Sequence, residues 1–211
     1  MTIFRCPLCG GPLWEIPQGL RCPKGHSFDR AKEGYVHLLP VSQKHSLSPG
    51  DDKAMVAARR AFLDKGWYAP LREALAALAV AYTGSEPVVL DAGCGEGYYT
   101  VGIREALASA GKAPHVAGFD ISKFAVQKAA KRCPELDLAV ASAYHLPVAD
   151  GAVDLLLNVF SPLAIGEFRR VLKPGGYYLY VVPAANHLWE LKEVLYDAAY
   201  LNEEKETPYE G

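Results

Sequence analysis

The sequence lacks any apolar run near the roughly 18 residues that a membrane-spanning helix requires. Its first residues, Met1 to Pro7, also lack the basic and then apolar pattern of a secretory signal peptide. The composition is not that of a disordered chain, because 50% of the residues are hydrophobic and 22% are charged. We therefore expect a globular, cytoplasmic protein with no membrane partner.

A strong net charge of either sign is also missing. The chain has 22 Lys and Arg against 24 Asp and Glu, a net charge of −2. This balance argues against a generic nucleic-acid binder, since phosphate partners favour a basic protein. The charge is unevenly distributed, however, with a surplus of four positive charges in residues 1–66 and of six negative charges in residues 67–211. The positive segment could meet phosphates, or it could be ordinary solvated surface.

The five cysteines do not form a disulfide framework, because their number is odd and three of them lie within the first 22 residues. Cys6 and Cys9 form a C-x2-C pair, and Cys22 and His26 form a C-x3-H pair. Two such pairs supply the four N and S ligands of a tetrahedral zinc ion. A closed set of four ligands makes the zinc structural. If this zinc ribbon folds independently, losing the metal should leave the rest of the chain largely intact.

The length of 211 residues allows one ordinary domain and a small appendage, but not two full-size domains. We place the zinc ribbon in residues 1–40 and a linker with two helices in residues 41–85. The larger domain then covers residues 86–211. Cys94 and Cys133 lie in this domain, and we expect both to be packed in its core.

Strands and helices alternate through the larger domain, which predicts an α/β fold with a doubly wound parallel sheet. A glycine-rich loop, Asp91 to Gly97, joins the first strand to a helix, and such a loop lets the backbone approach a ligand closely. Asp120 ends the next strand, where a carboxylate can accept both hydroxyls of a ribose. The predicted strands are 88–91, 115–119, 136–141, 153–160 and 177–182, and the predicted helices are 54–65, 71–82, 98–110, 123–132, 163–172 and 187–200.

The glycine-rich loop does not have the G-x-G-x-x-G spacing of a dinucleotide site, which disfavours NAD. The loop and the residues after it resemble the class I S-adenosylmethionine-dependent methyltransferases, a Rossmann-like family. The residues that carry the resemblance are Asp91-x-Gly93-x-Gly95-x-Gly97, Asp120, Leu146-Pro147, Asp150, Asp154 and Leu172-Lys173-Pro174-Gly175-Gly176. The resemblance implies that Gly93, Gly95 and Glu96 contact the methionine and ribose, that Asp120 binds the ribose, and that Ser142 and Ala143 lie near the adenine.

The chain as a whole resembles the bacterial 23S rRNA (guanine-N1)-methyltransferases. The motifs that carry this resemblance are Cys6-Pro7-Leu8-Cys9, the segments 32–40 and 58–63, Gly93-Cys94-Gly95-Glu96-Gly97-Tyr98-Tyr99, and His187-Leu188-x-Glu190-Leu191-Lys192. The resemblance implies S-adenosylmethionine as the cofactor and a hairpin of 23S rRNA as the substrate. It also implies cofactor contacts at Tyr68, Gly95, Glu96 and His187. Phe160-Ser161-Pro162 is more similar to the branch associated with macrolide resistance.

The sequence does not identify the base that removes the proton from guanine N1. Asp154 and Asn158 are candidates, although Asp154 fits a structural role better. An amine methyltransferase would show Asn-Pro-Pro-aromatic at Asn158, which is absent, so methylation of adenine N6 is disfavoured. Trp14, Trp67, Phe160 and Trp189 could stack on a base, though we expect each in the core. We expect the ribbon and the helix with Arg59 and Arg60 to hold the RNA.

The chain stops after the fifth strand of a sheet that usually has seven, and it ends in an acidic tail at residues 203–206. An open sheet edge of this kind is a liability, so we expect a fragment or a partner that completes the sheet. Two other functions stay open: methylation of a small molecule such as a quinone precursor, and a non-catalytic adaptor. The oligomeric state, including a homodimer, also stays open.

Overall fold

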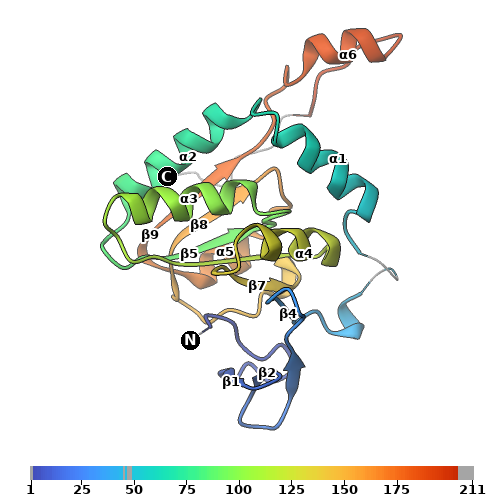
Figure 1. Ribbon diagram of the computed structural model, residues 1–211. Coiled ribbons are helices and arrows are strands. Elements are labelled where there is room, and N and C mark those ends of the chain that lie inside the picture. The colour runs from blue at the N-terminus through green and yellow to red at the C-terminus, as the bar shows by residue number, and fades with distance from the viewer. Residues whose placement is uncertain (1, 45, 47–48, 204–211) are drawn as a thin grey trace.

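The computed structural model describes residues 2–44, 46 and 49–203, and it contains two sheets (Figure 1). A three-stranded antiparallel sheet has the order β1-β2-β3, and a six-stranded parallel sheet has the order β4-β7-β6-β5-β8-β9. The strands are β1 (Trp14–Ile16), β2 (Gly19–Arg21), β3 (Ser27–Asp29), β4 (Val36–His37), β5 (Val88–Ala92), β6 (His115–Asp120), β7 (Asp137–Val140), β8 (Val153–Val159) and β9 (Leu172–Val181). The helices are η1 (Val41–Gln43), α1 (Lys53–Leu63), α2 (Ala69–Tyr82), α3 (Tyr98–Ser109), α4 (Lys123–Arg132), η2 (Ala143–His145), α5 (Ile165–Val171) and α6 (Trp189–Leu195).

Helices α1 and α4 begin at side-chain caps that the sequence supplies. The Asp52 side chain accepts hydrogen bonds from the backbone N–H groups of Ala54 and Met55 at the start of α1. At the start of α4, Ser122 Oγ accepts a hydrogen bond from the backbone N–H of Ala125. Among the described residues, no helix is both long and apolar enough to cross a membrane.

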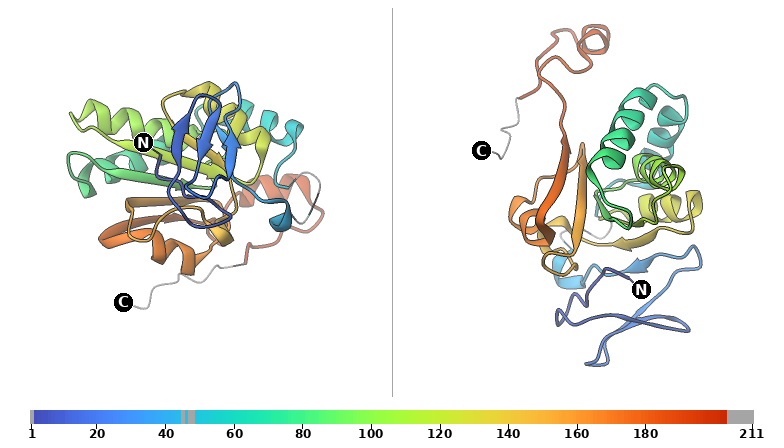
Figure 2. Two further views of the ribbon diagram at one scale, coloured as in Figure 1. Left: turned by 90° about the horizontal axis from the view of Figure 1, so that it is seen from below. Right: turned by 90° about the vertical axis from the view of Figure 1, so that its left-hand side faces the viewer.

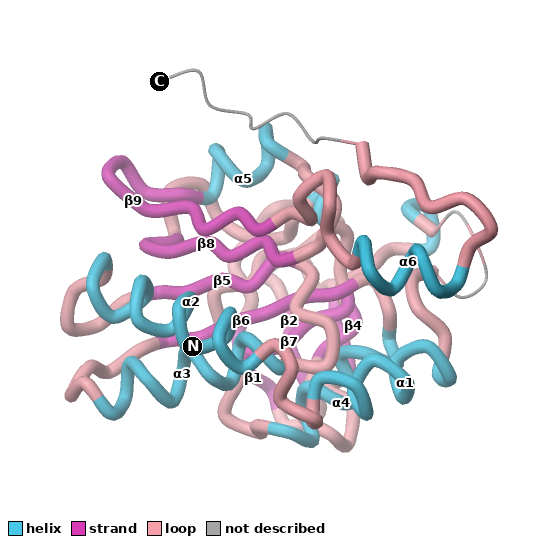
Figure 3. The backbone as a smooth tube through the Cα atoms, turned by 90° about the horizontal axis from the view of Figure 1, so that it is seen from above, coloured by secondary structure: helices cyan, strands magenta, loops and turns pink. Residues whose placement is uncertain are grey.

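Each face of the six-stranded sheet packs against a different part of the chain (Figures 2 and 3). Because side chains alternate along a strand, Val89 points into one buried cluster and Leu90 into the other. The cluster around Val89 contains residues of α2, α3 and α4. The cluster around Leu90 contains residues of α5 and of the zinc ribbon. The ribbon therefore covers part of one sheet face.

The ribbon is continuous with the core of the larger domain. Phe4 and Leu20 are fully buried, and they belong to the same cluster as Phe119 of the central sheet. Strand β4 leaves the ribbon and pairs in parallel with β7, so that Val36 lies opposite Ala139. The sequence analysis predicted no strand there, since a strand of two residues has too little pattern to detect. At the opposite edge, β9 begins at Leu172, five residues before the predicted start at Tyr177.

The other elements of the larger domain agree with the sequence. The predicted doubly wound sheet is confirmed, and the helices of residues 53–132 agree with the predicted ones to within two residues at each end. Helix α6 is shorter than predicted and has no buried residue. Most of the acidic tail lies outside the described residues.

Candidate zinc and cofactor sites

The four predicted zinc ligands come together in the structure. Their ligand atoms all lie within 4.8 Å of one another. Cys9 Sγ lies 3.7 Å from Cys22 Sγ, and His26 Nδ1 lies 3.4 Å from Cys6 Sγ. Sulfur ligands at roughly 2.3 Å from a tetrahedral zinc ion would be about 3.8 Å apart, so these side chains fit one Zn²⁺. All four positions are filled by protein, which makes the site structural.

The two remaining cysteines are buried away from this site, as predicted. Burial, together with the nearby carboxylates of Asp91 and Asp120, raises the pKa of Cys94 well above its usual value. Burial also raises the pKa of Cys133, whose thiol lies 3.1 Å from Glu135 Oε2. Both thiols are therefore protonated packing groups and not nucleophiles.

The glycine-rich loop turns sharply between β5 and α3, at the carboxyl edge of the sheet. The backbone N–H groups of Gly93 and Cys94 both donate to the carbonyl of Phe119, which ties the loop to β6. Gly93 has a φ of +80°, and an added Cβ would lie 2.0 Å from Ser161 Oγ. Only glycine fits this position, because the loop from β5 and the loop after β8 touch there.

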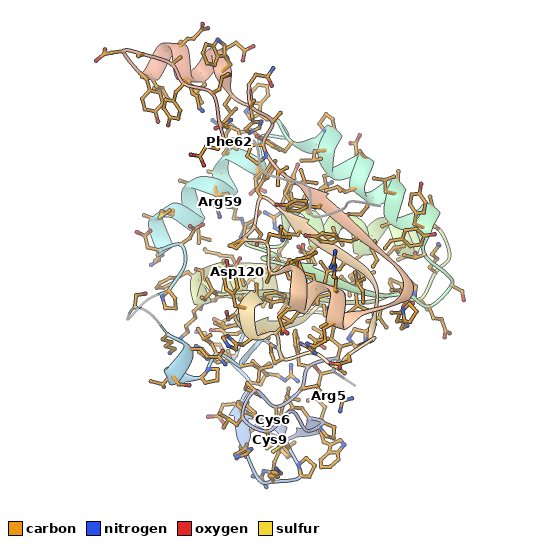
Figure 4. All side chains as sticks on the ribbon, turned by 180° about the vertical axis from the view of Figure 1, so that it is seen from behind. Arg5, Cys6, Cys9, Arg59, Phe62 and Asp120 are labelled. Carbon is orange, nitrogen blue, oxygen red and sulfur yellow. The ribbon has the colours of Figure 1, made fainter. Side chains whose placement is uncertain are left out.

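A cavity of about 470 Å³ opens against this loop, and six of the eight predicted cofactor residues line it. These six are Tyr68, Gly93, Gly95, Glu96, Asp120 and His187. Figure 4 shows Asp120 below Arg59 and Phe62, which come from α1. The sequence analysis missed these two α1 residues as cavity residues, because no motif of α1 indicates which part of the fold it covers.

Ser142 and Ala143 do not line the cavity. They follow β7 at the same edge of the sheet, where Ser142 Oγ accepts a hydrogen bond from the backbone of Tyr144. The proposed contact of these two residues with adenine therefore has no support from the cavity.

The cavity carries a concentration of acidic groups. Asp120 Oδ2 accepts from Gly95 N at 3.0 Å and Asp120 Oδ1 from Ser122 N at 2.8 Å. Burial raises the pKa of Asp120, and these two hydrogen bonds oppose the shift. Asp91 is buried two residues before Gly93 and does not line the cavity; burial raises its pKa to about 7, although Thr100 donates a hydrogen bond of 2.6 Å to it. Buried carboxyl groups of this kind favour a cationic ligand.

One carboxylate oxygen of Glu96 is left without a hydrogen-bond donor among the described residues. Its Oε2 accepts from Arg132 Nε at 2.9 Å and from Nη2 at 2.6 Å. Its Oε1 is buried and accepts no hydrogen bond from any of the residues that the structure describes. A buried carboxylate oxygen left unsatisfied costs roughly 1–3 kcal/mol or more. Glu96 lines the cavity, and a donor on a bound ligand would satisfy it.

Helix α1 forms one side of the cavity through Arg59, Phe62 and Leu63. Arg59 forms an ion pair with Asp51, and both residues line the cavity. Arg60 lies 3.4 Å from Asp64 and 3.9 Å from Glu96. The expectation that these two arginines hold RNA gains no support, since both have acidic partners at the cofactor cavity.

Aromatic side chains from three separate segments surround the mouth of the cavity. Tyr68 Oη lies 3.2 Å from His187 Nε2, and the Phe160 ring lies 5.8 Å from the ring of His187. Phe160 is 42% exposed and has a φ of +53°, a strained conformation for this residue. The expectation that Phe160, Trp14 and Trp67 lie in the core is wrong, because all three are exposed.

The two candidates for a catalytic base lie elsewhere. Asp154 is at the opposite end of β8 from the cavity, where it accepts hydrogen bonds from Val88 N and Lys173 Nζ. Its position fits the structural role, and Asp154 does not line the cavity. Asn158 is fully buried, does not line the cavity, and donates to the carbonyl of Pro162.

We expect Asp120→Asn to weaken S-adenosylmethionine binding by about tenfold or more, since each hydrogen bond to a charged group is worth roughly 1.5–3 kcal/mol. Both carboxylate oxygens of Asp120 already face backbone N–H groups, so an amide NH₂ would meet a donor at one of them. Isothermal titration calorimetry gives the affinity. Glu105→Gln, an exposed change on α3, is the control. Equal affinities in the two variants would contradict the assignment.

Comparison with known proteins agrees with both sites. Residues 4–47 match the family described as "RlmA, N-terminal", a zinc ribbon, and residues 89–176 match the family described as "Methyltransferase domain". A solved structure, a putative S-adenosyl-L-methionine-dependent methyltransferase from Methanococcus maripaludis, has a TM-score of 0.52 at 19% identity. The match covers 72% of this chain and 74% of that one, and it supports the fold alone.

Two similar proteins extend the match over both domains. The 23S rRNA (guanine(748)-N(1))-methyltransferase of Streptomyces fradiae is 43% identical over 195 residues, which covers 91% of this chain and 67% of that protein. A putative 23S rRNA (guanine-N(1)-)-methyltransferase of Micromonospora griseorubida is 42% identical, over 91% of this chain and 69% of that protein. Both comparisons include the ribbon, because they cover nine-tenths of the chain.

Proposed function

The chain belongs to the family of 23S rRNA (guanine-N1)-methyltransferases, and from this premise we propose that it methylates N1 of a guanine in a hairpin of 23S rRNA. The observation that carries the proposal is the union, in one chain, of a zinc ribbon and a cofactor cavity. An enzyme that methylates a small molecule would need the cofactor cavity but not the zinc ribbon. A non-catalytic adaptor would need no aromatic residues at the mouth of the cavity.

S-adenosylmethionine, when bound, supplies a methyl group on a positively charged sulfur. The residues of the cavity suit its two cationic groups and its ribose. We assign the ribose hydroxyls to Asp120, whose oxygens each have a second lone pair free to accept a hydrogen bond. We assign the amino group of the methionine portion to Glu96, because its Oε1 is a buried acceptor without a partner. Tyr68 and His187 complete the cofactor contacts at the mouth.

The target base must leave its helix, because N1 lies on the Watson–Crick edge of guanine. Phe160 is the residue placed to receive it: its ring is half-exposed, lines the cavity and is held by contacts to Tyr68 and His187. A base stacked on Phe160 would be shielded from water and aligned for in-line transfer. Removal of the N1 proton is assigned to no residue of this chain.

Three finer points stay predictions within this proposal. The cytoplasm is the expected location, a homodimer is one expected assembly, and macrolide resistance is one expected consequence of the modification. The similarity of residues 160–162 to the resistance-associated branch supports the last point.

We expect mass spectrometry of 23S rRNA treated with this protein and S-adenosylmethionine to find N1-methylguanosine in one hairpin. The same RNA treated with Gly93→Ala, which obstructs the cofactor loop, is the matched control. A methyl group found on an adenine, on a ribose or only on small molecules would overturn the assignment.

A further inference from the structure

A second cavity, of about 610 Å³, lies between the zinc ribbon and the larger domain. One wall is the start of the ribbon, from Arg5 to Gly10, and the other is the segment 144–150 that follows β7. Figure 4 shows Arg5 beside Cys6 and Cys9 at the junction of the two domains. We name this cavity the junction groove. None of the residues assigned to the zinc ion or the cofactor lines it, apart from Cys6.

The groove is held rigidly by a network around Arg170. The guanidinium donates to both oxygens of Glu167, at 2.9 and 2.8 Å, and to Asp150 Oδ1 at 2.7 Å. It also donates to the carbonyls of Leu146 and Val148. The ribbon joins this wall directly, because Arg5 N donates to the carbonyl of Pro147 at 2.7 Å. The groove is therefore preformed, and Arg170 pairs with both of its acidic residues, Glu167 and Asp150.

Two side chains of the groove are left to bind a ligand: the cationic Arg5 and the aromatic Tyr144. Within the part of the chain that the structure describes, the Arg5 guanidinium has no ion-pair or hydrogen-bond partner. The Tyr144 side chain is 61% exposed, and among the described residues none stacks on its ring or hydrogen-bonds to its hydroxyl. The imidazole of His145 is also exposed and lines the groove beside it.

We propose that the junction groove binds an unpaired nucleotide of the RNA substrate outside the target guanine, with its base stacked on Tyr144 and its phosphate on Arg5. Stacking of a base on an aromatic ring and pairing of a phosphate with an arginine are two contacts by which proteins bind single-stranded RNA whatever its sequence. A duplex would not fit this role, because its bases are already stacked. The proposal deepens the proposed function and rests on it for the identity of the RNA.

The position of the groove supports a shared substrate with the cofactor cavity. The groove wall follows β7 and Asp120 ends β6, and these strands are neighbours joined by a hydrogen bond from Ala141 N to Asp120 O. The groove wall therefore starts next to the strand that ends in Asp120, and it runs from there to Asp150, shortly before β8 begins. The segment after the ribbon also lines both, through Gln43 in the groove and Gly50 in the cofactor cavity. One RNA molecule can then engage the groove while its target base enters the cofactor cavity.

The test uses the whole protein with unmodified 23S rRNA and with a fluorescent oligouridylate as probes. We expect Tyr144→Ala to raise KM for the rRNA and Kd for the oligouridylate by about fivefold or more. Tyr144→Phe keeps the ring, so its values should stay within about twofold of those of the unchanged protein. Arg5→Gln should weaken binding several-fold and reduce the slope of log Kd against log salt by about one.

Two controls separate the groove from the cofactor site and from charge in general. Affinity for S-adenosylmethionine should be the same in all three variants, because none of the altered residues lines the cofactor cavity. Arg104→Gln removes the same charge at the opposite edge of the sheet, where Arg104 pairs with Glu135, and should leave RNA binding unchanged.

Unchanged RNA binding in Tyr144→Ala, or equal loss in Tyr144→Phe, would overturn the proposal. A loss of cofactor affinity in either Tyr144 variant would do so as well, since it would place Tyr144 at the other cavity. The proposed function can fail separately: in that case the unchanged protein binds the oligouridylate through the groove but yields no N1-methylguanosine.

Discussion

Replacing Cys9 with serine should release the zinc ion and lower the melting temperature of the whole protein by roughly 10 °C or more. The reason is that the ribbon is part of the main core. Phe4 and Leu38 are 1% exposed and belong to the buried cluster that includes Leu90 and Phe119 of the central sheet. Losing the packing of one such large side chain costs about 3–5 kcal/mol, and 1 kcal/mol shifts the melting temperature of a chain this long by about 2–4 °C.

This result would differ from what the sequence predicts. The expectation from the sequence is that loss of the metal leaves cofactor binding largely intact if the ribbon folds independently. In the structure β4 leaves the ribbon and becomes an edge strand of the main sheet, next to β7. Loss of the metal should therefore loosen that edge, close to Asp120 on β6, and weaken cofactor binding as well.

Cys133→Ser is the matched control for Cys9→Ser, because it makes the same chemical change at a buried cysteine far from the zinc ligands. Elemental analysis should find one zinc per chain in Cys133→Ser and none in Cys9→Ser, and differential scanning fluorimetry gives the melting temperatures. A Cys9→Ser protein with full zinc content would refute the ligand assignment. A zinc-free protein with an unchanged melting temperature would refute the coupling between ribbon and sheet.

The parts of the fold that the sequence predicts are those with a strong local pattern. The strands β5, β6 and β8 are continuous apolar runs, and α3 and α4 have caps or glycines at their starts. Strand β4 has two residues, and its pairing with β7 depends on contacts across about a hundred positions of sequence. A strand of two residues is too short to show the alternation of apolar and polar residues by which strands are detected.

Some residues of the candidate site could likewise be predicted from the sequence, and others could not. Asp120 and the glycine-rich loop could be predicted, because the chemistry needs those residue types at that spacing. Arg59 and Phe62 could not, since α1 reaches the cavity only through tertiary packing. Phe160 could not be predicted as an exposed ring either, because a phenylalanine seldom adopts a positive φ and nothing local in the sequence indicates one.

We expect Gly93→Ala to reduce affinity for S-adenosylmethionine by about a hundredfold or more, with two physical costs that can be separated. The first is backbone strain, roughly 1–2 kcal/mol for a non-glycine residue at this φ of +80°. The second is a collision, because the new Cβ would lie 2.0 Å from Ser161 Oγ and 2.7 Å from Ser161 Cβ. To relieve this collision, the loop that carries Ser161 and Phe160 must move away from the glycine-rich loop. Both loops line the cavity, so its shape changes on two sides.

Two further variants isolate these costs. Gly111→Ala has nearly the same φ, +76°, with no atom within 4 Å of the new Cβ, and lies outside the cavity. It should lower the free energy of unfolding by about 1–2 kcal/mol and leave cofactor affinity unchanged. Ser161→Gly in the Gly93→Ala background removes both colliding atoms and should restore most of the lost affinity, leaving only the cost of strain. Isothermal titration calorimetry on the three variants measures their affinity for S-adenosylmethionine. If the double variant binds no more tightly than Gly93→Ala, the collision with Ser161 does not limit binding.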